Sequence, residues 1–337
     1  MNKSILTLAL VASLAACGRD EPEQAATPAA PADAPAATAT APAAATPEAV
    51  DPAAQARIDA RAQAAVAAAP AGGTVDVAKL PAATDAASFA AKLDQVLAGN
   101  HRSEENRARD AYRHPKETLA FFGLKPGDRV VEITPGGGWY TEVLAPLMRG
   151  NGTLVAAIWD DTVQGQAQYR YDVINRFKTM LATRPDVYDQ VELEMFTPPG
   201  ETSLGAPGSA DAVLTFRNVH NWIGDDSAPA VFKAAFEVLK PGGVFGVVEH
   251  RAAAGKSAAE SFKSGYLSED AVIKLATDAG FTLAEKSEVN ANPKDTKDHP
   301  EGVWTLPPSL RLGEQDRDKY LAIGESDRMT LKFVKPQ

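Results

Sequence analysis

The chain has 337 residues and one cysteine, and 34 Lys and Arg against 44 Asp and Glu give it a formal charge of −10. That length suffices for one large domain or two small ones with a full hydrophobic core. The acidic balance, with no long basic run, makes nucleic acid an unsuitable partner. A single cysteine excludes disulfides within the chain, cysteine-based metal sites and CxxC redox chemistry.

The N-terminal residues predict export and a lipid anchor. Lys3 is followed by an apolar stretch, Ile5–Leu14, that is too short to span a bilayer. Ala15, Ala16 and Cys17 then resemble the bacterial lipoprotein signal, in which cleavage leaves the cysteine first and acylated. We expect a signal peptide over 1–16 and lipidation at Cys17, which would hold the exported protein to a membrane. A glycine after the cysteine favours the periplasmic face of the outer membrane. Ordinary cleavage that leaves a free thiol is the alternative.

Residues 17–84 predict a spacer. Alanine, proline and threonine dominate this stretch, and few apolar side chains offer a face to bury. We therefore expect a lipidated, flexible linker over 17–84. One folded domain is expected over 85–337, with an N-terminal helical cap at 85–122.

Beyond the linker, amphipathic helical patterns alternate with apolar runs. Helices are expected at 85–98, 103–113, 115–122, 138–148, 165–182, 227–239 and 269–279. Strands are expected at 129–134, 153–159, 191–196, 211–216, 244–249, 281–289 and 329–334. Strands separated by helices indicate an α/β domain whose parallel sheet is covered on both faces. The long charged stretch Asn290–Asp327 is expected to form either a lid or a disordered excursion.

In such a sheet, ligands bind beyond the carboxyl ends of the strands. This rule selects the stretches Thr134–Tyr140, Trp159–Asp161, Arg217–Trp222 and Glu249–Arg251. The first of them is a glycine turn, Gly136–Gly138, between an apolar strand and a helix. Glycines let backbone amides approach a ligand, and the following helix N-terminus favours an anionic group. A tight turn without a ligand is the alternative. Thr141 stands where a dinucleotide-binding Gly-x-Gly-x-x-Gly would place its third glycine, which argues against NAD or FAD.

These residues resemble class I, seven-stranded S-adenosylmethionine-dependent methyltransferases. The first motif of that family appears here as Glu132-x-Thr134-x-Gly136-x-Gly138, with threonine in place of the first glycine. The runs Ser209–Leu214 and Leu239–Gly243 resemble strand four and the turn before strand five, and Met329–Val334 resembles the antiparallel strand seven. The sequence EITPGGGWYTE is similar to a motif in a group of bacterial predicted methyltransferases. The resemblance implies a Rossmann-like, doubly wound, mostly parallel seven-stranded sheet with N-terminal helices.

The resemblance also implies S-adenosylmethionine as cofactor. Its methionine end would be held by Glu132 and the backbone of Gly136, Gly137 and Gly138, with Thr134 in the same turn. Tyr140 would either line this site or simply begin a helix. Asp160 and Asp161 lie one or two places late for the acid that receives the ribose hydroxyls, so either could serve or neither. The run Phe196–Pro199 replaces the acid often found after strand three, which leaves the adenine contacts unassigned.

Methyl transfer requires that the acceptor be held in line and, if protonated, relieved of a proton. His220 is the first candidate because histidine titrates near neutral pH and because it follows the fourth strand. Asn218 would orient an acceptor, and His250, after the fifth strand, is the second candidate for proton transfer. The alternative for His220 and for the nearby Trp222 is packing between helix and sheet, with the asparagine as a helix cap.

Two further patterns bear on the site. Arg102, Asn106, Arg109 and Arg113 share one helical face, which would either bind an anionic substrate or form a salt-bridged surface. HxH and HExxH patterns do not occur, so we expect no metal centre.

The sequence thus predicts a lipid-anchored envelope protein that transfers methyl from S-adenosylmethionine to a small or lipid-like acceptor. One alternative is a tethered binding or scaffolding domain that keeps the fold without the chemistry, because S-adenosylmethionine is made in the cytoplasm. An NAD-dependent oxidoreductase is a third, weaker interpretation.

Overall fold

The computed structural model describes residues 74–256 and 262–337. The predicted signal peptide, Cys17 and most of the predicted linker lie outside these residues. The described chain starts with a short helix, η1 (Val77–Lys79), and the side chains of Val77 and Ala83 are buried in the domain core. In the described ranges, no helix combines the length and apolarity needed to cross a membrane.

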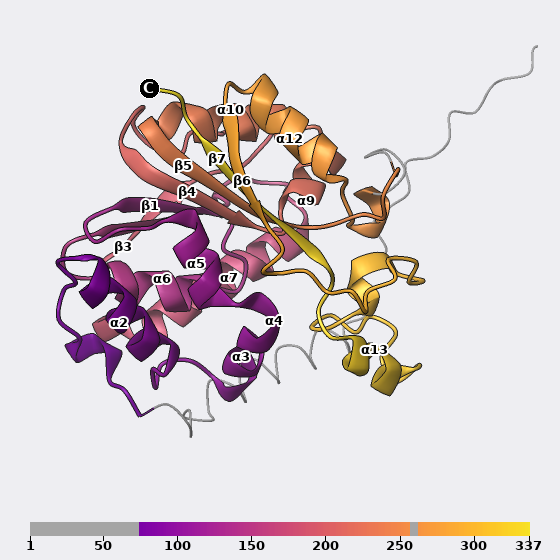
Figure 1. Cartoon of the computed structure of the whole chain (residues 1–337), viewed down its shortest axis with the longest axis horizontal. Helices are drawn as coiled ribbons and strands as arrows, with labels where there is room; N and C mark the ends of the chain where they lie inside the picture. Colours follow the sequence, from indigo (N-terminus) through magenta and orange to yellow (C-terminus); the bar gives the residue numbers. More distant parts are fainter. Residues whose placement is uncertain (1–73, 257–261) are drawn as a thin grey trace, which may run out of the picture. The chain divides into compact units, whose positions relative to one another are not determined.

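The domain is built on one seven-stranded sheet with the strand order β3-β2-β1-β4-β5-β7-β6 (Figure 1). Its strands are β1 (Arg129–Ile133), β2 (Thr153–Ile158), β3 (Val191–Met195), β4 (Ala210–Phe216), β5 (Leu239–His250), β6 (Thr282–Ser287) and β7 (Arg328–Val334). Strands β1 to β5 are parallel, whereas β7 runs antiparallel to both β5 and β6. The predicted fold class, including the antiparallel last strand, is confirmed.

The central strands read as apolar runs because both faces of the sheet are covered. Val131 and Ile133 of β1 face one core, with α9, α10 and α12, and Val130 faces the other, with α2, α5 and α6. Figure 1 shows α10 and α12 on one side of the sheet and α5 and α6 on the other.

Most helices occur where the sequence places them. The described helices are η1, α2 (Ala86–Leu97), α3 (Glu104–Ala108), α4 (Asp110–Arg113), α5 (Pro115–Phe122), α6 (Thr141–Met148), α7 (Gln168–Thr183), α8 (Pro185–Tyr188), α9 (Val219–Gly224), α10 (Ala228–Val238), η2 (Phe262–Ser264), α12 (Glu269–Asp278), η3 (Gly302–Thr305) and α13 (Arg317–Ile323). The sequence patterns did not indicate the short helices α8, α9 and α13.

The single helix expected at 103–113 is wrong, because the chain forms α3 and α4 there. The amide of Arg109 bonds to the carbonyl of Asn106 in a tightened turn, and α4 restarts from the Arg109 carbonyl. Pro115 then disfavours the right-handed helical region for His114, which adopts a φ of +39°. Of the side chains of α4, that of Arg113 is buried at the sheet edge where the site lies, whereas that of Tyr112 is exposed.

The segment Asn290–Asp327 packs against the domain. Its anchor is the buried carboxylate of Asp295, which accepts hydrogen bonds from the Tyr266 hydroxyl at 2.9 Å and from the amide of Asp327 at 2.8 Å. His299 Nε2 lies 2.9 Å from the same carboxylate. These bonds fix the segment beside β5 and β7, and part of it forms a wall of the site.

Candidate active site

A cavity of about 400 Å³ lies at the carboxyl ends of β1, β4 and β5. This volume falls within the range of small-molecule sites. Its wall consists of the turn after β1, the loop after β4, the end of β5, residues of α3 and α4, the stretch 303–309 and the residues just before β7. The cavity is therefore where ligands bind in open α/β sheets.

The glycine turn presents open backbone to this cavity. Gly136 and Gly137 line it, and a Cβ atom added at either would meet nothing within 4 Å. Gly138 has a different role, because a Cβ there would lie 2.2 Å from Met180 of α7. Thr134 also lines the cavity, with a φ of +50° and a buried hydroxyl that has no hydrogen-bond partner among the described residues. The turn thus offers main-chain atoms and one free hydroxyl to a ligand.

Glu132 and Tyr140 lie outside the cavity lining. Glu132 is buried and accepts a hydrogen bond of 2.6 Å from the Thr141 hydroxyl of α6, and burial raises its pKa to about 7. Tyr140 stacks on Phe216 with ring centroids 3.5 Å apart, and its hydroxyl donates to the carbonyl of Arg113. Glu132 thus fixes α6 below the turn, and Tyr140 fixes α4 beside it.

The two acids after β2 are also outside the lining. Oδ1 of Asp160 accepts hydrogen bonds from the amide and hydroxyl of Thr162, at 2.8 and 2.7 Å. Asp161 forms an ion pair of 2.5 Å with Lys178 of α7. The structure therefore does not bring either carboxylate to the cavity, and their predicted ribose contact stays a prediction.

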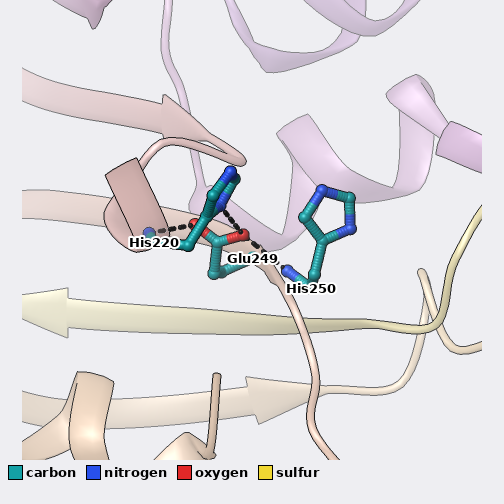
Figure 2. A group of neighbouring side chains, drawn as sticks. All are labelled: His220, Glu249 and His250. Atoms are coloured by element: carbon teal, nitrogen blue, oxygen red, sulfur yellow. Dashed lines mark hydrogen bonds and ion pairs between the residues drawn. The ribbon is translucent and has the colours of Figure 1, made fainter. Parts of the chain in front are cut away.

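His220 lines the cavity and forms a buried pair with Glu249, which is outside the lining (Figure 2). Nδ1 of His220 lies 3.0 Å from Oε1 of Glu249. The other carboxylate oxygen accepts from the amide of Val219 at 2.7 Å, which anchors the start of α9. Because an ionised carboxylate only accepts hydrogen bonds, it selects the His220 tautomer with the proton on Nδ1, and Nε2 keeps its lone pair.

His250 lies next to this pair, with its ring centroid 5.4 Å from that of His220. Its Nδ1 bonds to the Ser326 hydroxyl, and burial, together with His220 and Arg217, lowers its pKa well below the usual value. His250 is therefore neutral at pH 7 and fits a role in positioning or hydrogen bonding.

The donor atoms of His220, Glu249 and His250 lie within 4.8 Å of one another, close enough to hold a metal ion. However, Glu249 already accepts from the amides of Val219, His220 and His250 and from the His220 ring. A metal would need those lone pairs, so the arrangement fits an oriented histidine better than a metal centre.

Asn218 connects two strand ends. Its side-chain amide donates to the carbonyl of Ile133 at 3.1 Å, to the carbonyl of Thr134 at 3.3 Å and to the Thr215 hydroxyl at 3.1 Å. The residue lines the cavity, but its amide nitrogen is used to hold the glycine turn against the loop after β4. Trp222 is buried in the core against Phe232, in agreement with the packing alternative.

A cluster of arginines forms the remaining wall. Nε of Arg109 lies 2.7 Å from Glu325, Nε of Arg113 lies 3.0 Å from it, and an Nη atom of Arg328 lies 3.0 Å from it. Arg217, at a φ of +64°, lines the cavity beside them. Burial alone would raise the pKa of Glu325, but these cations hold it well below its usual range. Arg102 pairs instead with Asp110 at 2.7 Å.

Four residues of this site were not predicted from the sequence: Glu325, Ser326, Arg328 and Trp304. A usable signal was present, because an antiparallel last strand must start at the edge where the parallel strands end. The residues just before β7 therefore had to lie beside the carboxyl end of β5. Trp304 had no such signal, since it belongs to the long segment between the last two strands.

Comparison with known proteins gives likeness of fold only. No protein-family model matches the chain, and no curated protein does. An S-adenosylmethionine-dependent methyltransferase from Aquifex aeolicus is 15% identical, with 73% of this chain and 97% of that one covered and a TM-score of 0.45. A putative methyltransferase from Bacillus halodurans is 15% identical, with 67% and 100% covered and a TM-score of 0.42. Fibrillarin from Aeropyrum pernix, solved with natively bound S-adenosylmethionine, is 11% identical, with 65% and 73% covered and a TM-score of 0.37. The chain has the seven-stranded fold of class I methyltransferases, as its own strand order and antiparallel β7 show.

Proposed function

We propose that this protein transfers a methyl group from S-adenosylmethionine to a small or lipid-like acceptor in the cell envelope, anchored there through Cys17. The observation that carries the proposal is that an open glycine turn and His220, which is paired with the buried Glu249, line one cavity at the carboxyl ends of the strands. The turn provides close backbone approach, and the pair provides a base of fixed tautomer.

The residues fit the cofactor at its amino-acid end. Amides of the turn at Gly136 and Gly137 would receive its carboxylate, and the unpaired hydroxyl of Thr134 offers a further donor. Asp160 lies two residues after the end of β2 and outside the cavity lining, and only Oδ1 of its carboxylate is engaged by Thr162. When bound, S-adenosylmethionine supplies an electrophilic methyl group on a sulfonium.

The chain's own residues then handle the acceptor. His220 Nε2 takes the proton from an acceptor O–H or N–H while the acceptor heteroatom forms a bond to the methyl carbon. The carbon–sulfur bond breaks, and its electron pair stays on sulfur. Glu249 stabilises the imidazolium that forms, because its carboxylate already lies 3.0 Å from Nδ1.

A non-catalytic binding domain is the second candidate. Three acids that would suit the cofactor are engaged within the fold, since Glu132 bonds to Thr141, Asp160 to Thr162 and Asp161 to Lys178. This interpretation keeps the cavity as a ligand site and gives His220 no proton to move.

Calorimetric titration of S-adenosylmethionine and its demethylated product into the full-length chain tests the proposal. We expect micromolar binding, about −8 kcal/mol. Gly137→Ala is the informative variant, because its methyl group meets no protein atom within 4 Å yet enters the ligand space. It should keep wild-type thermal stability and lose about tenfold or more in affinity. Absence of binding to the wild type would leave the binding domain as the function.

A further inference from the structure

The cavity carries more positive charge than its own residues compensate. Four guanidinium groups, those of Arg109, Arg113, Arg217 and Arg328, surround a single carboxylate, Glu325. The nearby His250 is neutral, so it does not change this balance of charge. Arg113 and Arg328 are almost fully buried, with 1% and 3% of their side chains exposed. Uncompensated charges at such depth are costly unless something pairs with them.

Several donors of the cluster are also unused. Arg109 and Arg113 reach Glu325 through Nε, and the Nη2 atom of each is buried without a hydrogen-bond partner among the described residues. The guanidinium group of Arg217 has no hydrogen bond or ion pair with any residue that the structure describes. Burial lowers the pKa of Arg217 to about 10, so it remains charged at pH 7.

Bonds outside the arginine cluster also hold α3 and α4 to the domain. The indole N–H of Trp139 donates to the carbonyl of Asn106 in α3 at 3.0 Å. The hydroxyl of Tyr140 donates to the carbonyl of Arg113 in α4. The side chain of Arg217 forms no hydrogen bond or ion pair with a described residue, although its backbone adopts a left-handed φ that L residues avoid. A strained, unpaired cation in a cavity is better explained by a ligand than by folding.

S-adenosylmethionine does not satisfy the cluster. Its one carboxylate is accompanied by an ammonium and a sulfonium, so it adds net positive charge. We propose that the arginine cluster binds the acceptor through a multiply charged anionic group, a phosphate monoester or a dicarboxylate. This inference rests on the proposed function in that it names the acceptor class. The fork of each guanidinium matches the oxygen pairs of such groups.

The position of the cluster suits an acceptor. Arg217 follows β4 directly, His220 lies three residues later in the first turn of α9, and both line the cavity. Ser326 follows Glu325 in the chain and bonds to His250, so the residues just before β7 border the cavity beside the histidines. An acceptor whose anionic group contacts the arginines would therefore place its remainder near His220 Nε2.

Isothermal titration calorimetry of inorganic phosphate with the full-length chain, at low and constant ionic strength, tests this site. We expect saturable binding tighter than about 1 mM, because several guanidinium donors converge on one anion. Arg217→Gln should weaken it by about tenfold or more without loss of thermal stability, since Arg217 has no partner to lose. Arg176→Gln, an exposed arginine of α7, is the matched control and should bind phosphate like the wild type. Phosphate binding that is absent, or equal in wild type and Arg217→Gln, would overturn the proposal.

The same variants separate this inference from the proposed function. Gly137→Ala should lose S-adenosylmethionine and keep phosphate, whereas Arg217→Gln should do the reverse. Phosphate binding without S-adenosylmethionine binding would retain the anion site and remove the methyltransferase. Vesicles of phosphatidic acid, whose headgroup is a phosphate monoester, and of phosphatidylcholine identify the source of the anion. Weaker binding of Arg217→Gln than of the wild type to phosphatidic acid vesicles alone indicates a lipid headgroup, and equal binding of both proteins indicates a soluble anion.

Discussion

At the scale of single residues, Glu249 organises the site. Its two oxygens accept four N–H groups, three from the main chain and one from the His220 ring. The sequence placed His220 and His250 near the site by their distance from strand ends, but treated Glu249 only as a flanking residue. Its role became visible only when β5 brought its carboxylate under the start of α9.

Glu249→Gln tests that role. In either orientation of the glutamine side chain, its NH₂ group would replace an oxygen that accepts from N–H groups, which leaves donors facing each other. We therefore expect a loss of about 1–3 kcal/mol in the free energy of unfolding. The His220 proton should also move toward Nε2, which nitrogen-15 shifts of the imidazole detect. Glu288→Gln removes an exposed partner of Arg251 and should change stability by less than about 1 kcal/mol. Unchanged imidazole shifts in Glu249→Gln would contradict the assigned tautomer.

Glu132 makes a separate prediction about pH. Its pKa is about 7 in the folded chain, against an ordinary value of 4.5, because burial disfavours the charged form. The stability that its proton provides is therefore complete below about pH 4.5 and is lost as pH rises through about 7. Glu132→Gln stays neutral and keeps the bond from Thr141. Urea denaturation should show similar stability of both proteins at pH 4.5 and an advantage of about 3 kcal/mol for the variant at pH 8. Parallel pH profiles would contradict the buried placement of this carboxyl.

At the scale of elements, the glycine turn shows how a sequence deviation is accommodated. Thr134 stands where the class I methyltransferase motif that this stretch resembles has glycine, and it adopts a φ of +50°, the left-handed conformation that glycine favours. A β-branched residue in that region stores strain, typically about 1–3 kcal/mol. The substitution therefore supports a function for the threonine hydroxyl, which is buried and unpaired among the described residues.

Thr134→Gly should relieve this strain. Glycine loses more backbone entropy on folding, which offsets about 0.5–1 kcal/mol, so we expect a net stabilisation of about 1 kcal/mol. Thr179→Gly in α7, an exposed threonine inside a regular helix, should instead destabilise by about 0.5 kcal/mol. Urea unfolding of both variants measures the difference. A destabilised Thr134→Gly would mean that the hydroxyl has a structural role.

At the scale of the whole molecule, the antiparallel β7 decides which residues meet. It brings the start of the last strand to the edge where β1, β4 and β5 end, so Glu325 reaches Arg109 and Arg113 across 216 and 212 positions of the chain. From the sequence, the arginine face was expected either to bind an anion or to form a salt-bridged surface. The structure shows a salt bridge to Glu325 and, beside it, guanidinium donors that remain unused.

The order of strands and helices along the chain, the parallel sheet and the position of the glycine turn follow from the sequence alone. These features are local, because buried strands read as apolar runs and turns require glycine. Which polar groups share the cavity depends on tertiary contacts. Those contacts bond Glu132 to Thr141 of α6, pair His220 with Glu249, and bring together arginines from the turn after α3, from α4, from the loop after β4 and from β7. Such pairings depend on contacts between residues far apart in the chain, and the periodicity of a sequence carries no record of them.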